Sequence, residues 1–118
     1  MTDEIGRPAP GTPLCRLEEI ADPGAKGFDY REGDRLWSGF VVRNGECVRG
    51  YLDQCPHAGS PLGDMIGRYL TRAGDLIICS AHGALFRIED GACIAGPCAG
   101  DRLQPWPVTV EGGMVTAG

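Results

Sequence analysis

The sequence lacks the features of several protein classes. No stretch approaches the roughly 18 apolar residues of a membrane span, and the opening MTDEIGRPAPGTP has neither the basic start nor the apolar run of a secretory signal. With 11 Lys and Arg against 16 Asp and Glu, the net charge is −5, so the basic excess that neutralises nucleic-acid phosphates is missing. We therefore expect a cytoplasmic protein that binds neither membranes nor nucleic acid.

Long amphipathic helices are also missing, because no helical periodicity extends beyond a turn or two. The 19 glycines and 9 prolines favour short strands joined by turns. Paired apolar runs flank four turn sequences, which predict four hairpins: Asn44-Gly45, Ala73-Gly74, Glu89-Asp90-Gly91 and Gly112-Gly113. The sequence therefore predicts an all-β, antiparallel fold, a small sandwich or barrel.

The chain is long enough for one domain. Residues 1–13 contain three prolines and no periodicity, which predicts a flexible tail, and residues 14–118 form the predicted domain. LCRL, at residues 14–17, is a candidate first strand, and residues 18–27 are predicted to be a turn-rich connection.

Two short motifs contain both histidines of the sequence. Cys55 and His57 are separated by one proline, and Cys79 and His82 by two residues. Each pair follows an apolar run and is followed by a glycine-containing loop, so two loops at adjacent strand ends are predicted to meet at one metal. With six cysteines and no secretory signal, metal ligands or reduced thiols are favoured over a disulfide framework.

Two thiolates and two imidazoles fit two kinds of centre. They make a closed tetrahedral zinc site, or they hold a 2Fe-2S cluster with two thiolates on one iron and two imidazoles on the other. Zinc motifs usually pair like residues, whereas each loop here supplies one Cys and one His. The remaining alternative is that the cysteines are buried apolar residues and the histidines are polar loop residues.

The segments CPHAGSPLG and CSAHGALFRIEDGACIAGPC together resemble the Rieske 2Fe-2S domain over roughly residues 14–115. The resemblance implies a Rieske-type β-sandwich or barrel, with a cluster-binding subdomain formed by two loops. It implies a 2Fe-2S cofactor ligated by Cys55 and Cys79 on the inner iron and by His57 and His82 on the outer iron.

Two further segments bear on the resemblance. Gly96-Pro97 matches the family's proline loop, which closes over the cluster from a third side. The spacer between the motifs is a few residues longer than in compact Rieske ferredoxins, and its DMIGRYLTRAGD segment is predicted to form an extended hairpin.

The resemblance also indicates a low reduction potential. High-potential members carry a disulfide between the ligand loops, but the corresponding residues here are Ser60 and Ala81. They also carry a serine and a tyrosine that donate hydrogen bonds to sulfur, where this chain has Ala84 and Phe86. Fewer donors leave more electron density on sulfur, so we expect a value near the lower end of the Rieske range of roughly −150 to +300 mV.

The function implied is one-electron transfer rather than catalysis by this chain alone. The implied role is the ferredoxin component that passes electrons from a flavin reductase to a terminal oxygenase. Three alternatives stay open: the small subunit of assimilatory nitrite reductase, which would bind that enzyme's large subunit, a structural zinc module and a redox-sensing module.

Several other residues have structural interpretations. Trp37 and Trp106 are predicted in the core or at its rim, and Gly83 is predicted to let the backbone pass close to the cluster. Asp53 and Asp64 flank the first loop and are predicted to be solvated carboxylates. The remaining cysteines are predicted to be small buried hydrophobes, with a Cys93–Cys98 disulfide possible but not required: Cys15, Cys47, Cys93 and Cys98.

Overall fold

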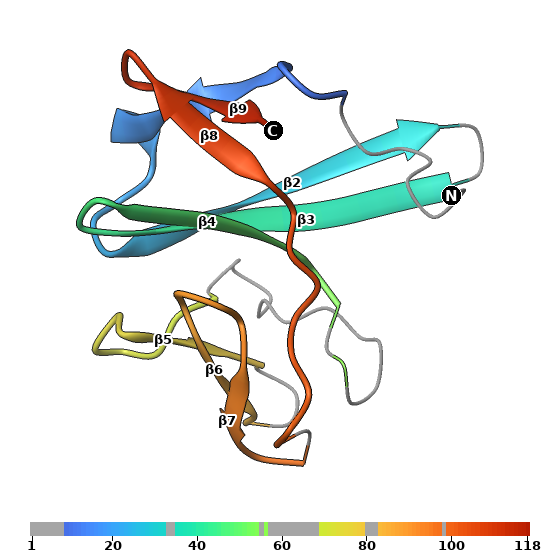
Figure 1. Cartoon of the computed structure of the whole chain (residues 1–118), viewed down its shortest axis with the longest axis vertical. Coiled ribbons are helices and arrows are strands. Elements are labelled where there is room, and N and C mark those ends of the chain that lie inside the picture. The colour runs from blue at the N-terminus through green and yellow to red at the C-terminus, as the bar shows by residue number, and fades with distance from the viewer. Residues whose placement is uncertain (1–8, 33–34, 55, 57–68, 80–82, 98) are drawn as a thin grey trace.

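The computed structural model describes residues 9–32, 35–54, 56, 69–79, 83–97 and 99–118. Their strands form three antiparallel sheets of three strands each, stacked one above another in Figure 1. The central sheet has the order β2 (Gly24–Glu32), β3 (Arg35–Asn44), β4 (Cys47–Leu52). The basal sheet has the order β1 (Pro13–Arg16), β9 (Met114–Ala117), β8 (Val108–Glu111). The loop-bearing sheet has the order β5 (Leu76–Ile78), β6 (Leu85–Arg87), β7 (Cys93–Ala95).

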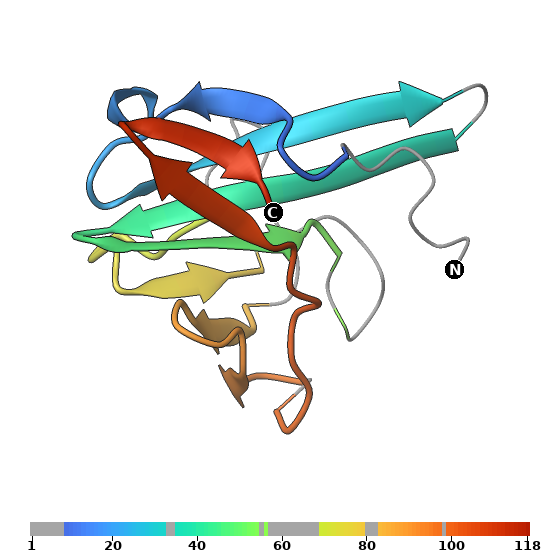
Figure 2. The same cartoon turned by 45° about the horizontal axis from the view of Figure 1, so that its top comes forward.

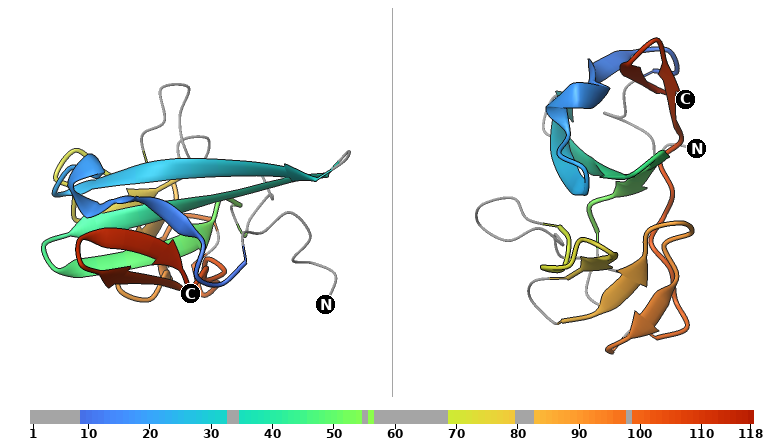
Figure 3. Two further views of the ribbon diagram at one scale, coloured as in Figure 1. Left: turned by 90° about the horizontal axis from the view of Figure 1, so that it is seen from above. Right: turned by 90° about the vertical axis from the view of Figure 1, so that its left-hand side faces the viewer.

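The central sheet is buried on both faces. On β3, Trp37 and Val41 contribute to the core shared with the basal sheet, while Phe40 and Val42 contribute to the core shared with the loop-bearing sheet. This alternation follows from the period of two along a strand. Figure 3 shows the consequence, with β2–β4 lying between the other two groups of strands. The predicted all-β antiparallel fold is confirmed.

All four predicted hairpins are present, as β3–β4, residues 69–78, β6–β7 and β8–β9. The first one turns a residue later than the Asn-Gly pair suggests, because Asn44 pairs with Cys47 across the ladder and Gly45 has a φ of 63°. The side chain of Asn44 instead donates a hydrogen bond of 3.0 Å to the carbonyl of Gly74 in the second hairpin.

The prediction of a connection over residues 18–27 is wrong in its second half. A 3₁₀ turn covers Leu17–Glu19, but β2 begins at Gly24 and pairs with β3 along its whole length. The glycines and charged residues of this segment interrupt the run of apolar residues by which a strand is usually predicted from sequence. Its apolar residues serve both cores: Ala25 packs toward the loop-bearing sheet, and Phe28 and Tyr30 pack toward the basal sheet.

The loop-bearing sheet is an insertion between β4 and β8. The chain leaves at the end of β4, where the N–H of Leu52 bonds to the carbonyl of Gln104 at 2.9 Å. It returns through residues 104–107, where Tyr51 bridges to Pro105 and the N–H of Trp106 bonds to Gly50 at 2.8 Å. Figure 2 shows this return segment running past the end of β4 to β8. The two crossings lie side by side, so the inserted part forms a subdomain.

The N-terminal boundary of the domain stays a prediction. Among the described residues, the N–H of Gly11 bonds to the carbonyl of Ala117 at 2.7 Å, and the N–H of Ala117 bonds to Thr12 at 2.9 Å. These bonds extend the pairing between β1 and β9 slightly toward the N-terminus.

Candidate metal centre

The second motif lies on the hairpin loop that joins β5 to β6. Cys79 directly follows β5, is fully buried, and its N–H donates a hydrogen bond of 2.9 Å to the carbonyl of Ala84. The N–H of Gly83 donates a bond of 2.7 Å to the carbonyl of Cys79. Gly83 has a φ of 74°, a conformation that costs glycine least. Both ends of the loop are therefore fixed, although His82 lies outside the described residues.

The Gly96-Pro97 loop packs against this hairpin. Gly96 has a φ of 103°, and a Cβ on it would lie 2.7 Å from Cα of Ala84 and 3.0 Å from Cβ of Ala84. Only glycine therefore allows so close an approach. The surroundings are apolar, since Ala84 and Phe86 are fully buried beside Cys79 in one core cluster. The structure thus places this loop beside the hairpin that begins after Cys79, and its closing over the cluster stays a prediction.

The first motif follows the end of β4. After Leu52, the N–H of Asp53 bonds to the carbonyl of Ser38 at 3.0 Å, and the N–H of Gln54 bonds back to Leu52 at 2.9 Å. Pro56 is exposed. Cys55 and His57 lie outside the described residues, as do Ser60 and Asp64. The structure thus fixes the strand end from which this loop departs.

Asp53 is not the solvated carboxylate that the sequence predicts. It is half-buried, and the hydroxyl of Tyr69 donates a hydrogen bond of 3.1 Å to its Oδ2. Burial raises the pKa of Tyr69, and the negative charge of Asp53 together with this hydrogen bond raises it further. The phenol therefore stays protonated and remains a donor. No sequence motif identifies Tyr69, which lies in the spacer and contacts Asp53 only through the fold.

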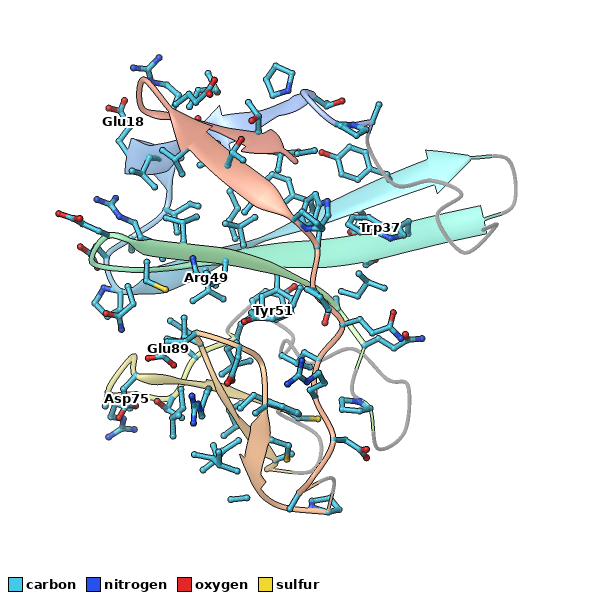
Figure 4. All side chains as sticks on the ribbon, viewed as in Figure 1. Glu18, Trp37, Arg49, Tyr51, Asp75 and Glu89 are labelled. Carbon is cyan, nitrogen blue, oxygen red and sulfur yellow. The ribbon has the colours of Figure 1, made fainter. Side chains whose placement is uncertain are left out.

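Two polar contacts hold the β6–β7 turn against the central sheet. The buried hydroxyl of Tyr51 donates a bond of 2.6 Å to the carbonyl of Ile88, and Nε of Arg49 donates one of 3.2 Å to the carbonyl of Glu89. Figure 4 shows Tyr51 extending from β4 toward this turn. Burial is the main cause that raises the pKa of Tyr51 to about 12.

The other cysteines and the tryptophans behave largely as predicted. Cys15 and Cys93 are buried, and the half-buried Cys47 packs against the core. The thiol of Cys93 donates a bond of 3.2 Å to the carbonyl of Ala95, while Cys98 lies outside the described residues, so the possible disulfide stays a prediction. Trp37 and Trp106 are both buried, with ring centroids 4.7 Å apart.

Of the four predicted ligands, Cys79 is among the residues that the structure describes. Cys79 lies on the hairpin loop against the Gly96 loop, whereas the positions of Cys55, His57 and His82 are not described. Within the described part of the chain, no group of three or more His, Cys, Asp or Glu residues could hold a metal ion. Among the described residues, no helix has both the length and the apolar character that a membrane span requires.

Comparison with known proteins gives the family. The model of the Rieske [2Fe-2S] domain matches residues 12–108, so the chain belongs to this family. A 2Fe-2S cluster is therefore its cofactor, and one-electron transfer is its class of function. No curated protein sequence matches the chain.

Solved structures agree with this family assignment. The ferredoxin of carbazole 1,9a-dioxygenase from Nocardioides aromaticivorans IC177 is 27% identical, with a TM-score of 0.68 over 91% of this chain and 97% of that one. The Sphingomonas yanoikuyae B1 ferredoxin is 25% identical, with a TM-score of 0.66 over 91% and 96%. In a complex of reduced oxygenase and oxidized ferredoxin in carbazole 1,9a-dioxygenase, the matching chain is 24% identical, with a TM-score of 0.70 over 90% and 99%.

The described residues fit such a cofactor. A fully buried thiol sits at the start of a loop that is fixed at both ends, its neighbours Ala84 and Phe86 are apolar and fully buried, and a glycine loop packs directly beside this hairpin. Low-dielectric surroundings of this kind are one of the means by which proteins set the potential of an iron–sulfur centre.

Proposed function

We propose that this protein is the ferredoxin component of a ring-hydroxylating dioxygenase system, taking electrons one at a time from a flavin reductase and passing them to a terminal oxygenase. Similarity to the ferredoxin of carbazole 1,9a-dioxygenase supports this role, because the match covers nearly the whole of both chains. A bound 2Fe-2S cluster supplies the single electron that the protein carries. The chain itself positions that cluster and presents it to its partners.

We further propose that Cys55 and Cys79 ligate one iron and that His57 and His82 ligate the other. The observation that carries this proposal is the placement of Cys79, fully buried at the start of a hairpin loop whose other end is closed by Ala84 and Gly83. His82 lies on that loop by sequence, and the first motif follows the end of β4. Mixed ligation by two thiolates and two imidazoles is the donor set of a Rieske centre.

The proposed compartment is the cytoplasm. Cys15 and Cys47 are free thiols rather than disulfide partners, which is the state expected in a reducing compartment. The proposed partners, a reductase and an oxygenase, would meet the protein there.

Reconstitution tests the proposed role. The iron-loaded protein is mixed with a purified flavin reductase and the terminal oxygenase of a ring-hydroxylating system, and product formation is followed with and without it. Product that depends on this protein supports the proposal. If the reductase cannot reduce it, or if the reduced protein cannot supply a terminal oxygenase, the proposed role is wrong. A colourless preparation that contains zinc would also overturn it.

A further inference from the structure

Tyr69 lies between the two ligand motifs in sequence and contacts the segment that precedes each of them. On one side, its hydroxyl donates the 3.1 Å hydrogen bond to Asp53, which lies two residues before Cys55. Asp53 is itself fixed to the central sheet, because its N–H bonds to the carbonyl of Ser38 at 3.0 Å. The side chain of Tyr69 therefore contacts the start of the first motif loop.

On the other side, the backbone of Tyr69 belongs to the hairpin that leads to Cys79. The N–H of Ile78 donates a bond of 2.9 Å to the carbonyl of Tyr69, and Leu70 bridges to Ile77. Ile78 is the last residue of β5 and directly precedes Cys79. One residue thus joins the segments from which both motif loops depart.

The surrounding strands accommodate the hydroxyl specifically. The ring of Tyr69 is stacked on Phe40 with centroids 4.4 Å apart and an angle of 11° between the planes. On β2, a Cβ at Gly27 would lie 2.6 Å from the hydroxyl oxygen of Tyr69, which is closer than van der Waals contact allows. A phenylalanine at position 69 would fill the same ring space without needing this glycine. The space beside Gly27 is therefore used by the oxygen atom.

We propose that Tyr69 is a positioning residue for the metal centre: its hydrogen bond to Asp53 fixes the backbone two residues before Cys55 relative to β5, the strand that directly precedes Cys79. This inference rests on the proposed ligand set, because it assigns Cys55 to the same centre as Cys79. The partners of ligating side chains orient them and tune the metal, and losing such a partner commonly lowers metal retention by about 10-fold or more. Tyr69 acts less directly than such a partner, because its hydrogen bond reaches Asp53, and Asp53 is connected to Cys55 through the backbone.

The test is Tyr69→Phe in the cluster-loaded protein. This variant keeps the stacked ring and removes only the hydroxyl, so it isolates the hydrogen bond. We expect iron to be lost to a chelator at least threefold faster than from the unmodified protein. We also expect a more negative midpoint potential, because the carboxylate of Asp53 loses a donor that partly offsets its charge.

Tyr51→Phe is the matched control. It also removes one buried tyrosine hydroxyl. The hydrogen bond of that hydroxyl goes to the carbonyl of Ile88, at the β6–β7 turn rather than next to either motif. It should lower the stability toward denaturant while leaving the potential and the rate of iron loss unchanged. Asp53→Ala removes the acceptor of this bond and should therefore also speed iron loss, and the effects of the two substitutions should be less than additive in the double variant, since they share this interaction.

Two outcomes would overturn the proposal. Tyr69→Phe with an unchanged potential and unchanged iron loss would show that the hydroxyl only fills space. Equal effects from Tyr51→Phe would show that general destabilisation is the cause. Both results are distinct from a failure of the proposed function, in which the unmodified protein itself would bind no 2Fe-2S cluster.

Discussion

The two faces of the central sheet make different sets of contacts with their neighbours. Toward the basal sheet, the core is dominated by packed rings: Trp106 contacts Trp37 at a centroid distance of 4.7 Å and Phe28 at 5.9 Å, both edge to face. Hydrogen bonds cross both faces. On the basal side, Nη1 of Arg43 donates to the carbonyls of Leu17 and Ile20 at 3.2 and 3.1 Å. On the loop-bearing side, two further bonds run from β4 to the β6–β7 turn. They join the hydroxyl of Tyr51 to Ile88 and Nε of Arg49 to Glu89.

The length of the strands explains why contacts to the central sheet matter on the loop-bearing side. The strands of the loop-bearing sheet have only three residues each, so the sheet gains little from its own ladder. Packing is tolerant of small shifts, whereas a hydrogen bond fixes both distance and direction. The basal rings therefore contribute mainly burial, whereas the bonds from Tyr51 and Arg49 help to hold the short strands of the loop-bearing sheet on the central sheet. The predictions below test this division, from the largest expected effect to the smallest.

Replacing the buried thiol of the loop-bearing side should have the largest effect. Cys79→Ser removes a proposed ligand, and we expect loss of essentially all iron, acid-labile sulfide and visible colour. Cys47→Ser is the control, because Cys47 is a half-buried cysteine that packs on the same core and is no proposed ligand. Iron content that survives in Cys79→Ser, or falls equally in Cys47→Ser, would contradict the ligand assignment.

Removing the central ring of the basal side should cost stability but leave the metal centre intact. Trp106 is 1% exposed, and Trp106→Ala should lower the free energy of unfolding by about 3–5 kcal/mol through lost burial and the cavity left behind. Chemical denaturation measures this loss, and electron paramagnetic resonance of the reduced protein should be unchanged. Val110→Ala, at a position that is 38% exposed, is the control and should change stability little. An altered resonance in Trp106→Ala would show that the two faces are coupled.

Tyr51→Phe tests the polar side. The substitution leaves the carbonyl of Ile88 without this donor, which should cost about 1–3 kcal/mol at neutral pH. The contribution depends on pH, because the pKa of Tyr51 is raised from 10.0 to about 12 in the folded state, chiefly by burial. A group with a raised pKa stabilises the fold fully below its unfolded pKa and loses that contribution as the pH rises through its folded value.

The stability difference between the parent protein and Tyr51→Phe should therefore be constant up to about pH 10 and shrink between about pH 10 and 12. Denaturant midpoints measured at several pH values check this. Tyr30→Phe gives a second tyrosine for comparison, half-buried on the basal side, whose pKa burial also raises. If the stability difference between the parent protein and Tyr51→Phe stays constant across this range, ionisation of Tyr51 does not remove the contribution of its hydrogen bond to Ile88, and the prediction is wrong.

The sequence predicted the hairpins well, because they depend on local chemistry. The turn at Gly112-Gly113 requires two positive φ values, 58° and 80°, and glycine supplies them at little cost. The strand β2 was missed because Gly24, Gly27 and its charged residues carry no local signal, and its partner β3 defines it through pairing. Propensity describes a residue's own backbone, whereas an edge strand depends on its neighbour.

The contacts around the site could not be predicted for a related reason. Tyr69 and Asp53 are 16 residues apart in the chain, and their hydrogen bond exists only because the hairpin at residues 69–78 packs against the central sheet, where Tyr69 stacks on Phe40. Nothing in the local sequence of either residue specifies the other. The ligand motifs were visible because each pair is contained within four residues. Residues that position a site from a distant point in the sequence form no such local motif.

The smallest predicted effect concerns the donors around sulfur. Ala84 is fully buried, and its carbonyl accepts the N–H of Cys79 at 2.9 Å, so a serine there would place a hydroxyl close to the second motif. Ala84→Ser should raise the midpoint potential, because a hydroxyl that donates to sulfur stabilises the added electron. A hydrogen bond worth about 1 kcal/mol more in the reduced state corresponds to about 40 mV for one electron. Protein-film voltammetry can resolve this shift. Ala84→Val, which adds bulk without a donor, controls for crowding against Gly96, whose Cβ position is 3.0 Å from Cβ of Ala84. An equal rise in both variants would attribute the effect to packing, and the low potential expected of this protein would then have a different physical origin.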